Sequence, residues 1–198
     1  MIDEKMFQRM RIPPKYWDAD ITKVGDPQNK YIIRYVRGLF DALDKGWGLL
    51  MWGEYSSGKT ATSCAIMKAV SVIKKTALFV TANDIPKYLI EKTIFDSQES
   101  MEERMISADL LVIDELILHS VDDSTFRDTC LETILRRRLG AKKSTIFTSN
   151  LSVEVIKDRF PAFSSVMTEA IFPIQFFGAF REEKSQQIAK FLLEEDNE

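Results

Sequence analysis

A glycine-rich stretch followed by lysine and threonine is the part of this chain whose residue types best suit chemistry. Residues 53–60 read Gly-Glu-Tyr-Ser-Ser-Gly-Lys-Thr and fit the phosphate-binding pattern G-x-x-x-x-G-K-[ST]. Gly53 and Gly58 allow the backbone to turn so that successive N–H groups face an anion. We expect Lys59 to reach the β- and γ-phosphates of a nucleotide and the Thr60 hydroxyl to hold Mg²⁺. The pattern predicts a nucleotide site; a plain Gly/Ser turn followed by lysine is the alternative.

The sequence on both sides of this loop favours the nucleotide interpretation. The apolar run at 47–52 is typical of a buried strand, and residues 60–75 have the length and apolar spacing of a helix. Strand, loop and helix in this order is the setting that the pattern requires, because a helix N-terminus also attracts phosphate.

A second candidate group follows the apolar run at 110–113. Asp114 ends this run as a Walker B aspartate would and is expected to hold Mg²⁺ together with Thr60, while Glu115 is placed to polarise a water for attack on the γ-phosphate. A strand that ends in two solvated carboxylates is the alternative. The Asp-Glu pair favours a hydrolase over a small-molecule kinase, which activates an acceptor other than water. The expected nucleotide contacts are Gly53, Glu54, Tyr55, Ser56, Ser57, Gly58, Lys59, Thr60, Ala61 and Asp114.

Two further residues are candidates for catalysis. Asn150 follows the apolar run at 145–148, and its amide is expected to orient the attacking water or contact the γ-phosphate; a turn-forming asparagine is the alternative. Arg159 is the candidate arginine finger, which would reach the γ-phosphate of a neighbouring subunit, and an ordinary surface arginine is its alternative. The expected catalytic residues are Lys59, Glu115, Asn150 and Arg159.

Several other side chains allow two interpretations or a weaker one. The arginines at 136–138 either contact a nucleic-acid backbone or form a solvated helix end, where the helix dipole favours cations. Tyr16 and Trp17 lie either near an adenine or in the core. Arg181 is a second, weaker candidate for the finger. His119 is the single histidine, and no metal cluster or catalytic triad can be assembled around it.

Apolar runs that alternate with helical segments predict a three-layer α/β fold with a parallel sheet covered on both faces. Ligands of such sheets bind beyond the carboxyl ends of the strands, where Gly53, Asp114 and Asn150 all fall. The side chains of Phe40 and Phe126 are expected to face the core. The expected strands are 47–52, 76–81, 110–113, 145–148 and 171–177. The expected helices are 3–11, 26–45, 60–75, one from 83 or 84, 98–107, 124–139, 152–160 and 182–193.

Length and charge set broader limits on function. With 198 residues and 45% hydrophobic content, the chain suffices for one well-cored domain, which we place at 26–198 after a leader at 1–25. A net charge of −3 argues against a bulk electrostatic grip on nucleic acid. Cys64 and Cys130 lack metal-ligand spacing and are expected to be buried free thiols in a reducing cytoplasm. No transmembrane stretch or secretory signal is recognisable, so no membrane partner is expected.

Taken in order, these residues resemble the ATPase domain of the DnaC/DnaI family of bacterial and phage replicative helicase loaders. That family belongs to the AAA+ ATPases and is related to the IstB transposition helpers. The likeness covers roughly residues 11–184. It rests on Ile12-Pro13-Pro14-Lys15-Tyr16, Leu78-Phe79-Val80-Thr81-Ala82, Leu111-Val112-Ile113-Asp114-Glu115-Leu116, Thr148-Ser149-Asn150-Leu151 and Val155-Ile156-Lys157-Asp158-Arg159, with Pro173-Ile174, Gly178 and Arg181 in a closing strand.

The resemblance implies an AAA+ core without the helical lid domain, since only residues 178–198 follow Phe177. It also implies ATP and Mg²⁺ as cofactors, a DnaB-type helicase and single-stranded DNA as partners, and a homo-oligomer in which Arg159 acts in trans. Two departures stand out. The family usually has a further glycine at the place of Ser56, and a separate helicase-gripping domain where this chain has only the short segment before Ile12. The alternatives are an IstB-like adaptor for a DNA-bound recombinase and a nucleotide-switched binding module with slow turnover.

Overall fold

Five parallel strands form the centre of the molecule in a computed structural model that describes residues 4–23, 29–90, 99–116, 121–159 and 161–177. The strand order is β2-β3-β4-β1-β5, and every described pairing is parallel. The predicted parallel α/β sheet is confirmed. The strands are β1 (Gly48–Gly53), β2 (Ala77–Thr81), β3 (Leu110–Leu116), β4 (Ser144–Ser149) and β5 (Ile171–Phe176).

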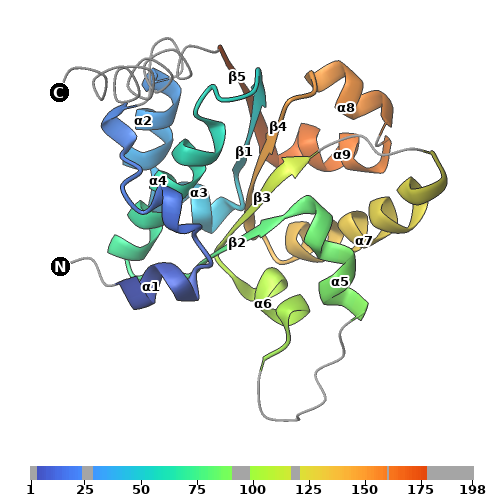
Figure 1. The fold of residues 1–198 in the computed structure, drawn as a ribbon, viewed down its shortest axis with the longest axis horizontal. Helices are drawn as coiled ribbons and strands as arrows, with labels where there is room; N and C mark the ends of the chain where they lie inside the picture. The colour runs from blue at the N-terminus through green and yellow to red at the C-terminus, as the bar shows by residue number, and fades with distance from the viewer. Residues whose placement is uncertain (1–3, 24–28, 91–98, 117–120, 160, 178–198) are drawn as a thin grey trace, which may run out of the picture.

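Helices cover both faces of the sheet, so that the fold has three layers (Figure 1). Elements α1 to α4 lie on one face, and α5 to α9 lie on the other. The bounds on the first face are α1 (Glu4–Arg9), the 3-10 turns η1 (Pro14–Tyr16) and η2 (Ile21–Lys23), α2 (Asn29–Arg37), α3 (Leu39–Lys45) and α4 (Lys59–Val72). Those on the second are η3 (Ala82–Asp84), α5 (Ile85–Ile90), α6 (Met101–Ser107), α7 (Val121–Gly140), α8 (Val153–Arg159) and α9 (Pro161–Ala170).

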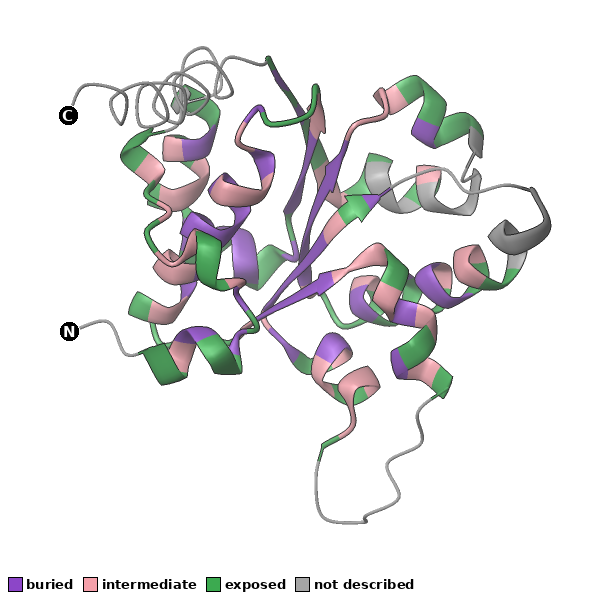
Figure 2. Cartoon of the chain, in the orientation of Figure 1, coloured by how far each residue is buried: buried purple, intermediate pink, exposed green. Residues whose placement is uncertain are grey.

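The strands alternate their side chains between two hydrophobic clusters, one under each helical layer. Leu49 and Met51 of β1 pack in the cluster with α1 to α4, whereas Leu50 between them packs in the cluster with α5 to α8. This alternation follows from the two-residue period of a strand. Because both faces are buried, the strands are nearly continuous apolar runs, as Figure 2 shows for the buried centre of the sheet.

The segment before α2 is packed into the same core. Phe7, Met10 and Ile12 are buried in the first cluster, and the Met10 carbonyl accepts a hydrogen bond of 2.9 Å from the Phe79 N–H on β2. The proposed boundary at residue 25 remains a prediction, but residues 7–12 contribute directly to the core of the sheet domain.

Three expectations about the helices were wrong. The helix expected over 26–45 is two helices, because glycine at position 38 has low helix propensity and separates α2 from α3. Helix α9 was not expected at all, although Pro161 stands at its first position, where proline fits a helix. The side chains of Phe40 and Phe126 are 62% and 56% exposed instead of facing the core.

Arg138 lies in neither of the environments expected for the arginines at 136–138. Arg136 pairs with Glu132 on the surface, but the Arg138 side chain is fully buried. Its guanidinium donates to the carbonyls of Met105, Ile106, Ala108 and Ser144 and to the Thr145 hydroxyl. Burial lowers the pKa of Arg138 to about 9, while Asp109 opposes the shift, so the group stays protonated at neutral pH. Arg138 therefore joins α6, α7 and β4.

Both cysteines are buried free thiols, as expected. Among the described residues, no helix is long and apolar enough to cross a membrane. The expectations for the C-terminal helix at 182–193, for Arg181 and for His119 fall outside the described residues.

Candidate nucleotide site

Most of the predicted site residues come together in one pocket of about 590 Å³. The loop after β1 provides one wall, and the ends of β3 and β4 provide the other. Because β4 lies between β1 and β3 in the sheet, the three carboxyl ends are neighbours. The lining residues are Lys15, Tyr16, Tyr55, Ser56, Ser57, Gly58, Lys59, Thr60, Ala61, Asp114, Glu115, Thr148, Ser149 and Asn150.

The loop has the backbone geometry that the motif predicts. Gly53 and Gly58 have φ angles of +134° and +92°, which L side chains rarely adopt. A Cβ at Gly53 would also lie 2.0 Å from the Phe176 carbonyl oxygen on β5, so the strand pairing itself requires glycine there. Ser56 has a φ of +61°, although it carries a side chain. The family's glycine at this place thus corresponds to a left-handed position in the loop.

Lys59 begins α4 and lies under the loop. Its ammonium donates to the carbonyls of Gly53 (2.8 Å) and Glu54 (2.5 Å), and the side chain is only 7% exposed. Burial lowers the pKa of Lys59, with Asp114 and Glu54 opposing the shift. The same loop is closed by the Ser57 hydroxyl, which donates to the Glu54 carbonyl at 2.8 Å. These contacts place one cation directly beneath the turn of the loop.

The two expected metal ligands are already in contact. The Thr60 hydroxyl donates to Asp114 Oδ1 at 2.8 Å, and the Thr148 hydroxyl donates to the same oxygen at 2.6 Å. Burial raises the pKa of Asp114 in spite of these two donors and of Lys15 and Lys59 nearby. A hydroxyl and a carboxylate are the hard oxygen ligands that Mg²⁺ prefers, so this pair fits that cation.

Glu115 follows at an irregular point of β3. Its φ angle is +61°, and its backbone N–H donates to the Thr148 hydroxyl at 2.9 Å. The side chain is exposed and lines the pocket together with Asn150. The structure therefore brings a carboxylate, an amide and the phosphate loop to one opening.

The remaining predicted residues are placed less directly. Gly53 and Glu54 contribute their carbonyls to Lys59 rather than lining the pocket. Arg159 ends α8, and its side chain lies outside what the structure describes, so the arginine finger stays a prediction. Tyr16 lines the pocket, whereas Trp17 packs on Phe7 with ring centroids 5.8 Å apart. Of the two aromatic residues expected either near an adenine or in the core, Tyr16 thus lies at the pocket and Trp17 packs against the core.

Three lining residues were missed by reading the sequence. Lys15 precedes Tyr16, and its ammonium lies 4.7 Å from the centre of that ring. Hydrogen bonding to Tyr16 raises the pKa of Lys15, and Asp114 adds to the shift. Thr148 and Ser149 are hydroxyl residues that directly follow the apolar pair Ile146-Phe147 at the carboxyl end of β4, which is the signal that would have identified them.

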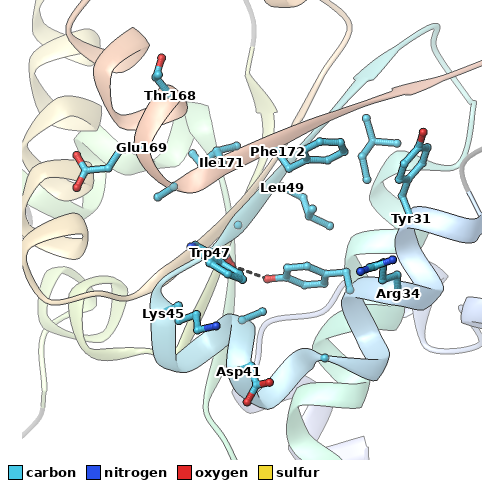
Figure 3. A pocket seen from close by; sticks show the side chains of 16 residues that line it. Tyr31, Arg34, Asp41, Lys45, Trp47, Leu49, Thr168, Glu169, Ile171 and Phe172 are labelled. Atoms are coloured by element: carbon cyan, nitrogen blue, oxygen red, sulfur yellow. Dashed lines mark hydrogen bonds between the residues drawn. The ribbon is translucent and has the colours of Figure 1, made fainter.

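A second hollow, of about 700 Å³, lies at the opposite end of β1 (Figure 3). Tyr31 and Phe172 stand on one side of it with ring centroids 5.8 Å apart, and the Tyr35 hydroxyl donates to the Trp47 carbonyl at 2.8 Å. Among the described residues, those that line this hollow include none that the sequence predicts to bind nucleotide. The phosphate chemistry thus points to the pocket at the strand ends.

Comparison with known proteins supplies an independent test of the resemblance. No family model matches the chain. The replicative helicase loader DnaI of Bacillus subtilis (strain 168) is 24% identical over 172 residues, which cover 80% of this chain and 54% of DnaI. The chain resembles DnaC/DnaI-type helicase loaders. It spans about half the length of this curated relative.

Solved structures agree on the fold. The DnaC helicase loader has a TM-score of 0.69 and 20% identity, covering 83% of this chain and all of the compared chain. The replication initiator DnaA, bound to AMPPCP and single-stranded DNA, has a TM-score of 0.60 and 15% identity, covering 91% of this chain and 56% of that one. The described sheet domain thus shares the fold of these structures, a parallel sheet with helices on both faces.

Proposed function

We propose that this chain binds ATP with Mg²⁺, hydrolyses it, and acts as a loader or accessory factor of a replicative helicase. The observation that carries the proposal is the single pocket in which the phosphate loop, the Thr60–Asp114 pair, Glu115 and Asn150 meet. The likeness to the DnaI helicase loader supports the choice of partner.

We propose a role for each residue, and its position supports that role. Lys59 leaves the loop carbonyls to neutralise the β- and γ-phosphates, while the N–H groups at the start of α4 bind phosphate oxygens. Thr60 and Asp114 would hold Mg²⁺, and the bound cation would offset phosphate charge. A cation next to Asp114 also favours the ionised carboxylate, which burial alone disfavours. Glu115 accepts a proton from water, and Asn150 orients that water.

Nucleotide binding is tested with a fluorescent ATP analogue. Lys59→Ala is expected to lower affinity at least 100-fold, because it removes the buried cation beneath the loop. Lys75→Ala is the matched control, since it removes the same charge just beyond the other end of α4 and is expected to bind like the wild type. Equal affinity of the Lys59 variant and the control would refute the phosphate assignment.

Hydrolysis is tested separately by phosphate release. Glu115→Gln keeps the shape of the side chain and is expected to bind ATP normally while its turnover falls by about 10²–10⁴-fold, the usual contribution of a general base. Glu154→Gln, at an exposed position of α8, is the control for the same chemical change. An unchanged rate in Glu115→Gln would remove this residue from the mechanism.

The partners require assays with purified components. A DnaB-type helicase is expected to bind the chain more tightly with ATP than without, and to be loaded on single-stranded DNA only in its presence. Single-stranded DNA is included in the assay because the similar DnaA structure is bound to single-stranded DNA. We also propose a homo-oligomer in which Arg159 acts in trans. Mixing Arg159→Ala with Lys59→Ala is expected to restore part of the turnover, and failure to do so in a proven oligomer would contradict the trans role.

A further inference from the structure

Strand β3 contains one extra residue just where the candidate catalytic acids lie. Ile113 is paired with Phe147 and Leu116 with Ser149, so that β3 advances three positions while β4 advances two. The bulge is accompanied by the left-handed φ of +61° at Glu115. A side chain in this conformation costs about 1 kcal/mol or more, so the surrounding structure must hold it.

Thr148 provides the contacts that hold this bulge. Its hydroxyl donates to Asp114 Oδ1 at 2.6 Å and accepts from the Glu115 N–H at 2.9 Å, and the side chain is 2% exposed. A hydroxyl has one donor hydrogen and two acceptor lone pairs, so one group serves both acids at once. Ser149 repeats the pattern beside it, donating to the Leu116 carbonyl at 2.6 Å and accepting from the Leu151 N–H at 3.1 Å.

We propose that Thr148 is a positioning residue for the nucleotide site: it fixes the Asp114 carboxylate toward the metal position and the bulge that presents Glu115. This inference rests on the proposed nucleotide function. Thr60 donates to the same carboxylate oxygen but is itself an expected metal ligand, whereas Thr148 contacts Asp114 from the neighbouring strand β4. Thr148 therefore acts through the two acids, as outer-shell partners of metal ligands do.

Three variants separate this role from general packing. Thr148→Val removes the hydroxyl at nearly constant volume, and Thr148→Ser keeps it. Thr145→Val is the matched control, because Thr145 is also a buried threonine of β4, but its hydroxyl accepts from Arg138 Nε at 3.0 Å instead of contacting the acids. The control is expected to lose stability without any change in Mg²⁺ dependence.

The first measurement needs no nucleotide. Hydrogen exchange of the Glu115 amide is expected to speed up at least tenfold in Thr148→Val and to stay protected in Thr148→Ser and Thr145→Val. The second measurement is the affinity for a fluorescent ATP analogue as a function of Mg²⁺ concentration. Its midpoint is the concentration that gives half of the Mg²⁺-dependent increase in affinity. This midpoint is expected to rise about tenfold in Thr148→Val, and kcat to fall about 10- to 100-fold with a smaller change in KM, the range found for outer-shell residues. Thr148→Ser is expected to keep both the Mg²⁺ midpoint and kcat close to the wild-type values.

Two failures are distinguishable. If the wild type binds ATP but Thr148→Val shows the same Mg²⁺ midpoint, kcat and Glu115 exchange as the wild type, the positioning role is wrong and the proposed function is untouched. The role is also wrong if Thr145→Val moves the Mg²⁺ midpoint equally, because the effect is then one of packing. If the wild type itself binds no ATP, the proposed function fails, and the Glu115 exchange alone decides whether Thr148 anchors the bulge.

Discussion

Replacing Arg138 by methionine should destabilise this protein more than any exposed arginine change. Methionine fills similar apolar space but donates no hydrogen bond. Three carbonyls that Arg138 serves in buried surroundings, those of Met105, Ala108 and Ser144, would then lack this donor. Met105 lies in the last turn of α6 and Ala108 is its C-cap, where the last carbonyls have no partner within the helix.

The magnitude follows from these contacts. A buried polar group left without a partner costs about 1–3 kcal/mol. Water that reaches the end of α6 would reduce this cost, so we expect the three carbonyls together to cost about 3–5 kcal/mol. Against a typical stability of about 5–15 kcal/mol, Arg138→Met should still fold at 25 °C but with a much lower urea midpoint. The measurement is the free energy of unfolding from urea titrations followed by circular dichroism, with the slope m compared between variants.

Arg136→Met is the control on the same helix. Its exposed i,i+4 pair with Glu132 is worth about 0.5 kcal/mol or less, so this variant should unfold close to the wild type. A loss of under about 1 kcal/mol in Arg138→Met would show that the buried contacts do not stabilise the fold. If Arg138→Met instead lost DNA affinity at unchanged stability, the nucleic-acid interpretation of the 136–138 run would be restored.

Two other changes test local features of the structure. Desolvation raises the pKa of Asp109, but hydrogen bonds from Lys143 and Thr76 outweigh it and lower the pKa from 3.8 to about 2, so the stabilisation is complete above about pH 5 and is lost progressively as the pH falls through 2. Asp109→Asn should therefore lose about 2 kcal/mol in urea titrations at pH 7, and most of this gap should be gone at pH 2; a gap independent of pH would contradict this. Ser56→Gly should raise stability by about 0.5 kcal/mol, because relief of the left-handed φ exceeds the added entropy of the unfolded glycine, while Ser56→Val should lower it. Thermal melts that rank these two variants the other way would rule out strain at this position.

The strands and the acids at their ends were predictable because they depend on local sequence. The first four residues of β3, at 110–113, are all apolar, and the two acids follow them directly. A parallel strand buried on both faces has such an apolar run whatever its neighbours. The phosphate loop is local as well, since its glycines and lysine act within eight residues. The convergence of β1, β3 and β4 followed from the rule that parallel strands share a carboxyl edge.

What could not be predicted depends on partners far away in sequence. Arg138 looks like its exposed neighbours, and only the carbonyls of Met105 and Ser144, brought by α6 and β4, make its burial favourable. The bulge at Glu115 is equally invisible, because it arises from the pairing of β3 with β4 and not from the residues of β3 alone. Phe126 is exposed although the helical period places it with inward residues.

Two non-glycine residues with left-handed backbone, Ser56 and Glu115, stand on opposite walls of the candidate site. Each has its neighbours fixed by short-range contacts: Lys59 and the Ser57 hydroxyl bind the Glu54 carbonyl beside Ser56, and Thr148 binds the Glu115 amide. Such strain persists only where the structure overdetermines it, and it is concentrated at functional sites. The backbone on both walls of the pocket is therefore held in a fixed conformation, and fixed dipoles of this kind are able to stabilise charge that develops on a phosphate.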